Sequence, residues 1–322
     1  MKLVVIMPAL NEEATIASVI ERIPRSIDGV DQVEVVVVDD GSTDKTVELS
    51  RQAGAHVVSH SENMGVGKAF ATGIDAALKL GADIIVNMDS DGQFSPEDIP
   101  TLVRPILENG YGFVTCTRFG NPDYMPEMPG IKKWGNRMMC HLVNRIIWNA
   151  KFTDVSCGFR AYSRDTALRL NLFGGFTYTQ ESFIDLAAKD IRMTEVPLKV
   201  RGVREFGKSR VASNLWKYAF ETVPIIVRAM RDTRPLIFFG IPAVAFLGLG
   251  AVQAAFLAAW WLATGRTSPW TSLVTVGVAC VLIGMMLFVV ALVADQLGRV
   301  RKIQECVLHI ARRGFFDNCR DQ

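Results

Sequence analysis

Two long apolar segments near the C-terminal end limit what this chain can fold into. They run from Leu236 to Thr264 and from about Leu273 to Ala294, and the only charged residue between Pro235 and Ala294 is Arg266. Each segment is long enough to cross the roughly 30 Å hydrocarbon layer as a helix that rises about 1.5 Å per residue. The sequence therefore predicts a hairpin of two membrane-spanning helices behind an otherwise ordinary soluble chain.

The charges beside this hairpin indicate how it lies in the membrane. Its flanks and turn carry these basic residues: Arg228, Arg231 and Arg234 before the first segment, Arg266 in the turn, and Arg299, Arg301 and Lys302 after the second. Because Lys and Arg concentrate on the cytoplasmic side, we expect both termini and the soluble domain there. Apolar residues at helical spacing over 213–233 and 300–316 predict two amphipathic helices, which either lie in the headgroup layer or pack on the soluble domain.

The soluble and apolar parts divide the chain into four predicted regions. They are a soluble domain over residues 1–211, a juxtamembrane amphipathic helix over 212–234, two transmembrane helices over 235–295 and a basic amphipathic tail over 296–322. A net charge of +2 and 49% hydrophobic residues argue against a disordered protein and against a nucleic-acid partner. The six cysteines form no CxxC pair, so we expect reduced thiols rather than a redox or zinc site.

Strand and helix signals alternate in the soluble domain. Strand-like runs lie at residues 3–7, 33–38, 56–59, 83–88 and 112–117. Helical patterns begin near Glu12, Thr43, Gly67 and Pro96, and Ser42 or Thr43 is expected to cap the second of them. This alternation predicts an α/β fold with a mostly parallel, Rossmann-like sheet, whose ligands bind at the carboxyl ends of the strands.

Acidic residues follow two of the predicted strands. The second strand ends in VVDDGSTD, which places Asp39 and Asp40 where they can accept hydrogen bonds from a base or ribose. The fourth ends in NMDSDGQ, and Asp89 and Asp91 share one face because they lie two residues apart on an extended chain. Two hard oxygen donors, with Gln93 just beyond, can hold Mg²⁺ or Mn²⁺ and leave coordination sites open for a diphosphate.

A set of motifs in this order resembles a known family. The motifs are PALNEE (8–13), VVDDGSTD (37–44), NMGVGKAFATG (63–73), MDSDGQ (88–93), TRF (117–119), TDVSCGFRAYSRD (153–165), TQESFID (179–185) and VREFGKSR (203–210). Together they resemble the family 2 glycosyltransferases with the GT-A fold. More narrowly, they are similar to the polyprenyl-phosphate glycosyltransferases, which include dolichyl-phosphate mannose synthases and undecaprenyl-phosphate sugar transferases. Ala9 and Leu10 depart from the bulkier residues that relatives often carry.

The resemblance implies a role for individual residues. It places Pro8, Leu10, Glu12, Asp39, Asp40, Asp89 and Arg118 at the nucleotide sugar, and Asp89, Asp91 and Gln93 at the metal. The residues implied near the reacting groups are Asp91, Asp154, Glu181 and Arg204. The acceptor phosphate is assigned to Arg204 and Ser209, to which charge and position add Lys208 and Arg210.

The implied reaction is an inverting transfer of a hexose from GDP-mannose or UDP-glucose to a dolichyl or undecaprenyl phosphate, with Mg²⁺ or Mn²⁺ as cofactor. A lipid monophosphate is substantially ionised at neutral pH, because its second pKa is about 6, so a strong general base is dispensable. Residues 197–234 hold nine Lys or Arg against three Asp or Glu, which suits an anionic headgroup. The family also suggests assembly through the membrane helices, for example as a homotetramer.

Two other interpretations compete with this one. Residues 202–209, GVREFGKS, fit the P-loop pattern of a nucleoside triphosphatase, but Lys199 and Arg201 lie where the preceding buried strand should be apolar. A processive polysaccharide synthase would share the GT-A core and would carry a QxxRW motif. The nearest string, QLGRV at 296–300, follows the second apolar segment and lacks the Trp.

Overall fold

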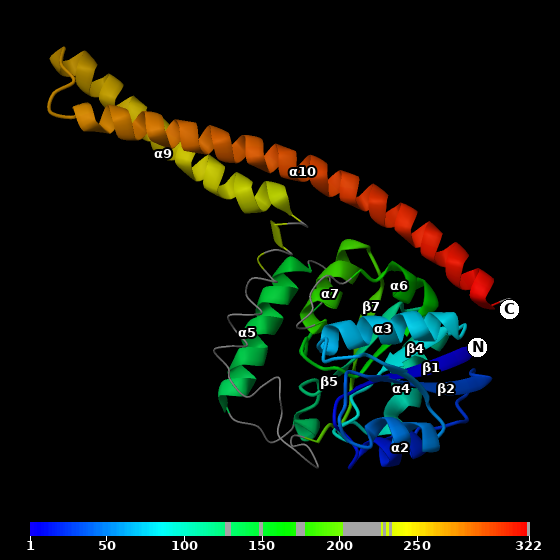
Figure 1. Ribbon diagram of the computed structural model, residues 1–322. Coiled ribbons are helices and arrows are strands. Elements are labelled where there is room, and N and C mark those ends of the chain that lie inside the picture. Colours follow the sequence, from blue (N-terminus) through cyan, green and yellow to red (C-terminus); the bar gives the residue numbers. More distant parts are fainter. Residues whose placement is uncertain are drawn as a thin grey trace. The chain divides into compact units, whose positions relative to one another are not determined.

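A computed structural model describes residues 1–125, 130–147, 151–171, 178–201, 227, 230–231 and 234–320, except for the side chains of 131, 132 and 146. The chain divides into two compact units. One comprises Met1–Ile226 together with Leu308–Gln322, and the other is Val227–Val307. Figure 1 shows the elements of both units.

The first unit is built on a mixed sheet. Within the described residues its strands are β1 (Lys2–Ala9), β2 (Gln32–Asp39), β3 (His56–Ser59), β4 (Ile84–Asn87), β5 (Phe113–Thr117), β6 (Arg160–Ser163) and β7 (Met193–Pro197). Their order across the sheet is β3-β2-β1-β4-β6-β5-β7. The neighbours are parallel except at β6, which runs antiparallel to both β4 and β5. The predicted mostly parallel sheet is therefore confirmed, with β6 as an antiparallel strand that the sequence did not reveal.

Helices cover both faces of this sheet (Figure 1). They are α1 (Ile16–Glu21), α2 (Thr46–Gln52), α3 (Val66–Lys79), α4 (Ile99–Asn109), α5 (Gly130–Ile146), α6 (Arg164–Arg169) and α7 (Thr179–Ala188), with 3₁₀ turns η1 (Pro96–Asp98) and η2 (Pro122–Tyr124). α1 and α4 pack on the face that holds Leu3 and Val5. On the other face, α3 approaches so closely that a Cβ at Gly73 would lie 3.2 Å from Ile6. Because both faces are covered, the central strands are apolar without alternation.

The predicted cap of the second helix is wrong. α2 begins at Thr46, and neither Ser42 nor Thr43 caps it. Instead, the backbone N–H of Asn11 donates to Ser42 Oγ at 2.9 Å, and the N–H of Thr43 donates to Asn11 Oδ1 at 2.8 Å. Asp44 Oδ1 accepts the N–H of Thr46 at 3.0 Å. The residues expected to start the helix therefore join the loop after β2 to the loop after β1.

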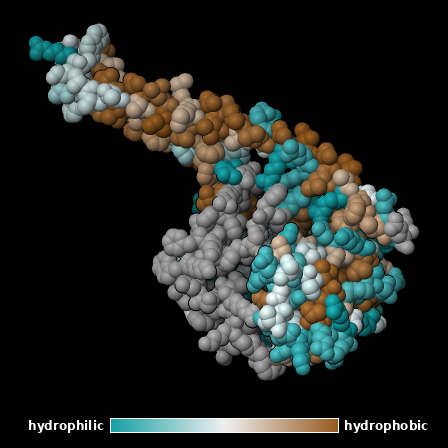
Figure 2. Space-filling model, viewed as in Figure 1, coloured by the Kyte–Doolittle hydropathy of each residue, from teal (hydrophilic) through white to brown (hydrophobic). Residues whose placement is uncertain are grey.

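The second unit contains the two apolar segments. α9 (Pro235–Thr264) and α10 (Thr271–Arg320) are long and apolar enough to cross a membrane, and Figure 2 shows their hydrophobic surface in brown. Small residues let the two helices approach closely, since a Cβ at Gly250 would lie 2.6 Å from Val281 and one at Gly284 would lie 2.7 Å from Leu247. The predicted hairpin therefore has the packing typical of membrane helices.

The predicted tail over 296–322 is not a separate helix, because α10 continues unbroken from Thr271 to Arg320. Its last residues belong to the first unit. Arg312 donates to Asp75 on α3 at 2.7 Å and to the carbonyl of Leu170 at 3.0 Å, and Arg320 pairs with Asp83 at 3.0 Å. Of the two arrangements expected for this segment, the structure shows packing on the soluble domain from Leu308 onward. Most of the other predicted amphipathic helix, 213–233, lies outside the described residues.

Candidate active site

The candidate site lies where β1, β2 and β4 end. Ser90, between the two aspartates of the loop after β4, donates its hydroxyl to the carbonyl of Pro8 at 3.1 Å. Thr15, at the start of α1, donates its hydroxyl to the carbonyl of Ser90 at 2.8 Å. These bonds join the acidic loop after β4 to the loop after β1. Asp91 is 2% exposed, and its Oδ1 accepts the backbone N–H of Gln93 at 3.1 Å.

The two aspartates at the end of β2 have different partners. Asp39 is buried and accepts the N–H of Ser42 at 2.9 Å. The Asp40 carboxylate accepts the N–H groups of Met64 and Gly65, both at 2.9 Å, and contacts His60 Nδ1 at 2.8 Å. Asp40 therefore shapes the loop that leads into α3. Its predicted contact with a nucleotide remains a prediction.

The Asp89 carboxylate lies against the loop that precedes β6. A Cβ built on Gly158 would lie 3.0 Å from Asp89 Oδ2 and 3.1 Å from Oδ1. Gln93 donates its amide to the carbonyl of Arg201 at 3.4 Å. The predicted metal ligands thus lie on one loop after β4, which contacts the loop after β1, the loop before β6 and the segment after β7.

The donor set of this region fits Mg²⁺ or Mn²⁺ bound together with a diphosphate. Asp89 and Asp91 supply the hard carboxylate oxygens that these cations prefer. Within the described ranges no group of three His, Cys, Asp or Glu could hold a metal ion by itself. Because Mg²⁺ is usually bound by one or two carboxylates together with substrate phosphates, a pair of aspartates is an adequate protein contribution.

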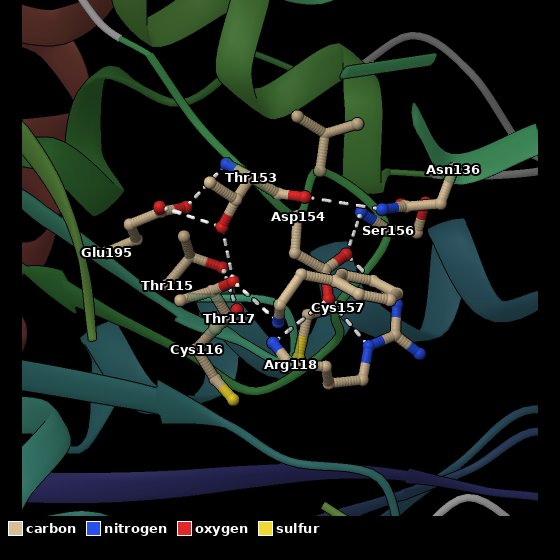
Figure 3. Close-up of polar contacts among 12 residues, drawn as sticks. Thr115, Cys116, Thr117, Arg118, Asn136, Thr153, Asp154, Ser156, Cys157 and Glu195 are labelled. Atoms are coloured by element: carbon tan, nitrogen blue, oxygen red, sulfur yellow. Dashed lines mark hydrogen bonds and ion pairs between the residues drawn. The ribbon is translucent and has the colours of Figure 1, made fainter. Parts of the chain in front are cut away.

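A buried ion pair lies at the end of β5 (Figure 3). Arg118 Nε donates to Asp154 Oδ2 at 2.6 Å and Nη2 donates to Oδ1 at 3.0 Å, while Asp154 is completely buried. Burial alone would lower the pKa of Arg118, but the negative charge and hydrogen bonds of Asp154 raise it above the ordinary arginine value. The family resemblance implied that Arg118 contacts the nucleotide sugar and that Asp154 lies near the reacting groups. The structure brings the two together as partners of each other.

A threonine network next to this pair was missed by the sequence reasoning. Glu195, on β7, accepts the Thr153 hydroxyl at 2.9 Å and the Thr153 N–H at 2.8 Å. The Thr153 hydroxyl also lies 2.6 Å from that of Thr117, as Figure 3 shows. Burial raises the pKa of Glu195 although the bonds from Thr153 oppose the shift. Nothing in the local string TEVP distinguishes this glutamate from a solvent-exposed one.

The remaining predicted residues divide into two groups. Glu12 donates its N–H to Thr46 Oγ1 at 2.8 Å, which holds the first loop beside α2, and Glu181 lies in the first turn of α7. Leu10 follows directly after β1. The predicted phosphate ligands Arg204, Lys208, Ser209 and Arg210 lie outside the described residues.

Comparisons with known proteins identify the family and the fold. Residues 4–169, more than half of the chain, match the model of Glycosyl transferase family 2. The crystal structure of glucosyl-3-phosphoglycerate synthase from Mycobacterium tuberculosis, in complex with Mn²⁺, UDP and phosphoglyceric acid, is similar with a TM-score of 0.55 and 27% identity, over 71% of this chain and 78% of that one. This similarity confirms the GT-A fold.

Three relatives share the sequence to different extents. The chain is 29% identical over 214 residues to UDP-N-acetylglucosamine–dolichyl-phosphate N-acetylglucosaminyltransferase of Methanococcus voltae, covering 60% of this chain and 83% of the relative. It is 27% identical over 227 residues to undecaprenyl-phosphate mannosyltransferase of Micrococcus luteus, covering 67% and 89%. It is 29% identical over 306 residues to glycosyltransferase AglJ of Haloferax volcanii, covering 93% and 95%. The family model matches more than half of the chain, and the GT-A sheet with its paired-aspartate loop agrees with that match. The chain therefore belongs to glycosyltransferase family 2.

Proposed function

We propose that this chain transfers a hexose from a nucleotide sugar to a polyprenyl phosphate at the cytoplasmic face of a membrane. One observation carries the proposal: the paired-aspartate loop of a GT-A domain is joined to the loop after β1 in a chain that also has two helices able to cross a membrane. Relatives named for dolichyl-phosphate and undecaprenyl-phosphate transfer support the choice of acceptor.

The donor side of the proposed site is formed by the loops after β1, β2 and β4. Pro8, Leu10, Glu12 and Asp39 would bind the nucleoside, and Asp40 would hold the adjoining loop in place. Asp89 and Asp91, with Gln93, would hold Mg²⁺ or Mn²⁺. A divalent cation at this position neutralises the charge that develops on a departing diphosphate.

The acceptor side needs little proton chemistry. The phosphate monoester has a second pKa of about 6, so it is already ionised near neutral pH and can attack the sugar directly. The Asp154 carboxylate is held through both oxygens by Arg118. We therefore assign Asp154 to orientation of the reacting groups and not to removal of a proton. A single in-line displacement would invert the anomeric centre and give a β-linked product.

The proposed lipid acceptor explains why the chain has helices able to cross a membrane. Each buried CH₂ of a polyprenyl chain is worth about 0.8 kcal/mol, so the lipid does not leave the bilayer and the enzyme has to reach its headgroup. Arg204, Lys208, Ser209 and Arg210 are proposed to bind that headgroup phosphate, and Glu181 is proposed to lie beside the reacting sugar. Cytoplasmic termini and assembly as a homotetramer remain part of this proposal.

A transfer assay tests the proposal. Purified full-length protein in detergent with Mg²⁺ would be given radiolabelled GDP-mannose, UDP-glucose or UDP-N-acetylglucosamine, each with a polyprenyl phosphate. We expect lipid-extractable label from one donor, loss of transfer with EDTA and an inverted linkage. Among the donors, GDP-mannose and UDP-glucose are our first candidates. Hydrolysis of a nucleoside triphosphate without any lipid-linked sugar would overturn the proposal, and a product with retained configuration would overturn the single displacement.

A further inference from the structure

Arg160 is the largest fully buried side chain in the described part of the first unit. It begins β6, it is 0% exposed, and no carboxylate forms an ion pair with it in the described part of the chain. Its guanidinium lies over the rings of Phe183, Tyr178 and Phe113, at 4.8, 5.7 and 5.6 Å from their centroids. Burial of a permanent cation without a carboxylate is costly, because the ion loses its hydration. What the guanidinium binds therefore indicates why it is there.

Among the described residues Arg160 donates to four acceptors, all of them neutral and three of them backbone carbonyls. Nε donates to Cys157 O at 2.7 Å and Nη2 donates to Val155 O at 3.2 Å. Nη1 donates to Thr179 O at 2.9 Å and to Ser182 Oγ at 2.6 Å. One side chain thus fixes the loop before β6 and the first turn of α7.

Asn87, the last residue of β4, fixes the next peptide of the same loop. Its amide nitrogen donates to Gly158 O at 2.7 Å and to the Tyr178 hydroxyl at 2.8 Å. Its Oδ1 is buried and has no hydrogen-bond partner among the described residues. An unsatisfied buried acceptor is destabilising, because the group has lost its hydrogen bonds to water. The two bonds that its amide nitrogen donates therefore explain why an asparagine occupies this position.

The loop held in this way touches the first aspartate of the DSD sequence. The three atoms nearest to a Cβ on Gly158 all belong to the Asp89 carboxyl group, at 3.0, 3.1 and 3.3 Å. Gly158 does not have a left-handed φ, so the backbone itself would accept an alanine. The glycine is therefore required by the close approach of the Asp89 carboxylate and not by the conformation of the loop.

We propose that Arg160, Asn87 and Gly158 are positioning residues that set the direction of the Asp89 carboxylate toward a divalent cation. This inference rests on the proposed function, in which Asp89 binds the metal. Arg160 and Asn87 hold the carbonyls of residues 155, 157 and 158, and Gly158 then forms the wall against which the carboxylate lies. Partners that orient a metal ligand in this way typically change metal affinity about 10–100-fold when they are removed.

Binding of Mn²⁺ to the full-length protein in detergent tests the inference, with the free ion followed by its electron paramagnetic resonance signal in the presence of UDP or GDP. Gly158→Ala pushes a methyl group against the Asp89 carboxylate, and we expect Mn²⁺ affinity to fall about 10-fold. The matched control is Gly135→Ala on α5, where an added Cβ meets nothing within 4 Å. This control should bind Mn²⁺ like the wild type. It should unfold at or slightly above the wild-type temperature, because alanine favours a helix over glycine, and Gly158→Ala should unfold close to the wild-type temperature.

Substitutions of Asn87 and Arg160, which lie further from the Asp89 carboxylate, distinguish a positioning role from a general contribution to core packing. Asn87→Leu removes the bond to Gly158 O, and Arg160→Lys keeps the charge but loses the planar fork. Both variants should bind Mn²⁺ more weakly and should bind the nucleotide in EDTA with wild-type affinity. A general loss of packing would weaken both kinds of binding. Wild-type Mn²⁺ affinity in Gly158→Ala would overturn the positioning role alone. A wild-type protein that binds no Mn²⁺ would overturn both this role and the metal site of the proposed function.

Discussion

The two halves of the sheet hold their acidic side chains in different ways. Beside β1, β2 and β4, the carboxylates of Asp39 and Asp91 accept backbone N–H groups from turns close in sequence, namely those of Ser42 and Gln93. Beside β5, β6 and β7, the carboxylates of Asp154 and Glu195 rely on residues far along the chain. Asp154 is held by Arg118, 36 residues away, and Glu195 by Thr153, 42 residues away. Local turns thus hold Asp39 and Asp91 in the first half, whereas Asp154 and Glu195 in the second half depend on tertiary contacts.

The largest expected effect concerns the first half. Asp89→Ala or Asp91→Ala removes a carboxylate proposed to hold the cation, and we expect turnover in the lipid-transfer assay to fall at least roughly 10³-fold. Because the loop around them is fixed by Ser90 and Thr15, the fold should persist, with a melting curve close to that of the wild type.

Asp31→Ala provides the control for this pair, since Asp31 is 89% exposed and pairs with the N-terminus. It should retain wild-type transfer. If Asp89→Ala and Asp91→Ala were also fully active, the assignment of the metal to the first half would be wrong.

The next effect concerns the second half. Arg118→Met leaves the buried Asp154 carboxylate without its cation, which should lower the free energy of unfolding by about 3–5 kcal/mol. The double variant Arg118→Met/Asp154→Leu removes both charges and should recover most of that loss. Denaturant unfolding of both variants measures the difference. Equal stability of the single and double variants would show that tertiary ion pairing does not organise this half.

This contrast also explains what the sequence could predict. The strands β1 to β5 were predicted from short apolar runs in the sequence. The acidic turns after β2 and β4 were predicted from the Asp and Gly residues that follow those two strands. β6 is four residues long and begins with the buried Arg160, and β7 is a half-buried edge strand. Neither carries a recognisable pattern.

The candidate site follows the same division. Asp89 and Asp91 were predicted from spacing, whereas Asp154 and Glu181 were reached only through the family resemblance. Glu195, Thr153 and the supporting roles of Arg160 and Asn87 were not predicted at all. The insertion of β6 as an antiparallel strand between β4 and β5 brings their partners near. This topology cannot be predicted from the spacing of residues along the chain.

A smaller effect tests how far local turns organise the first half. Gly41, directly after Asp40, has φ of +83°, and a Cβ there would lie 2.9 Å from the backbone of Glu62. Gly41→Ala combines a left-handed conformation with a backbone clash, so we expect a loss of about 3 kcal/mol in unfolding free energy.

Gly54→Ala is the matched comparison, because Gly54 also has φ of +83° but an added Cβ would meet nothing within 4 Å. We expect this change to cost only about 1 kcal/mol, which is the conformational contribution alone. Similar losses in both variants would mean that the close contact with Glu62 contributes nothing to the turn.

The smallest expected effect distinguishes the halves by the sign of their pH dependence. Burial raises the pKa of Glu195 above its ordinary value of 4.5, so the folded state binds a proton more readily than the unfolded state does. Its contribution to stability is present below that value and is lost as pH rises through the raised pKa.

Asp44, in the first half, behaves oppositely. Burial would raise its pKa, but the hydrogen bonds from Thr46 and Glu13 lower it below 3.8. Its contribution is present above 3.8 and is lost as pH falls through the lowered pKa.

The measurement is the unfolding free energy of the wild type, Glu195→Gln and Asp44→Asn between pH 3 and pH 7. Relative to Glu195→Gln, the wild type should lose stability as pH rises above about 4.5, and relative to Asp44→Asn it should lose stability as pH falls below about 4. Each difference should stay near or below about 1 kcal/mol, because both carboxyl groups are only partly buried. Opposite slopes are expected because hydrogen bonds from Thr46 and Glu13 stabilise the charged form of Asp44, whereas burial destabilises the charged form of Glu195. Slopes of the same sign would show that both halves stabilise their carboxylates by the same means.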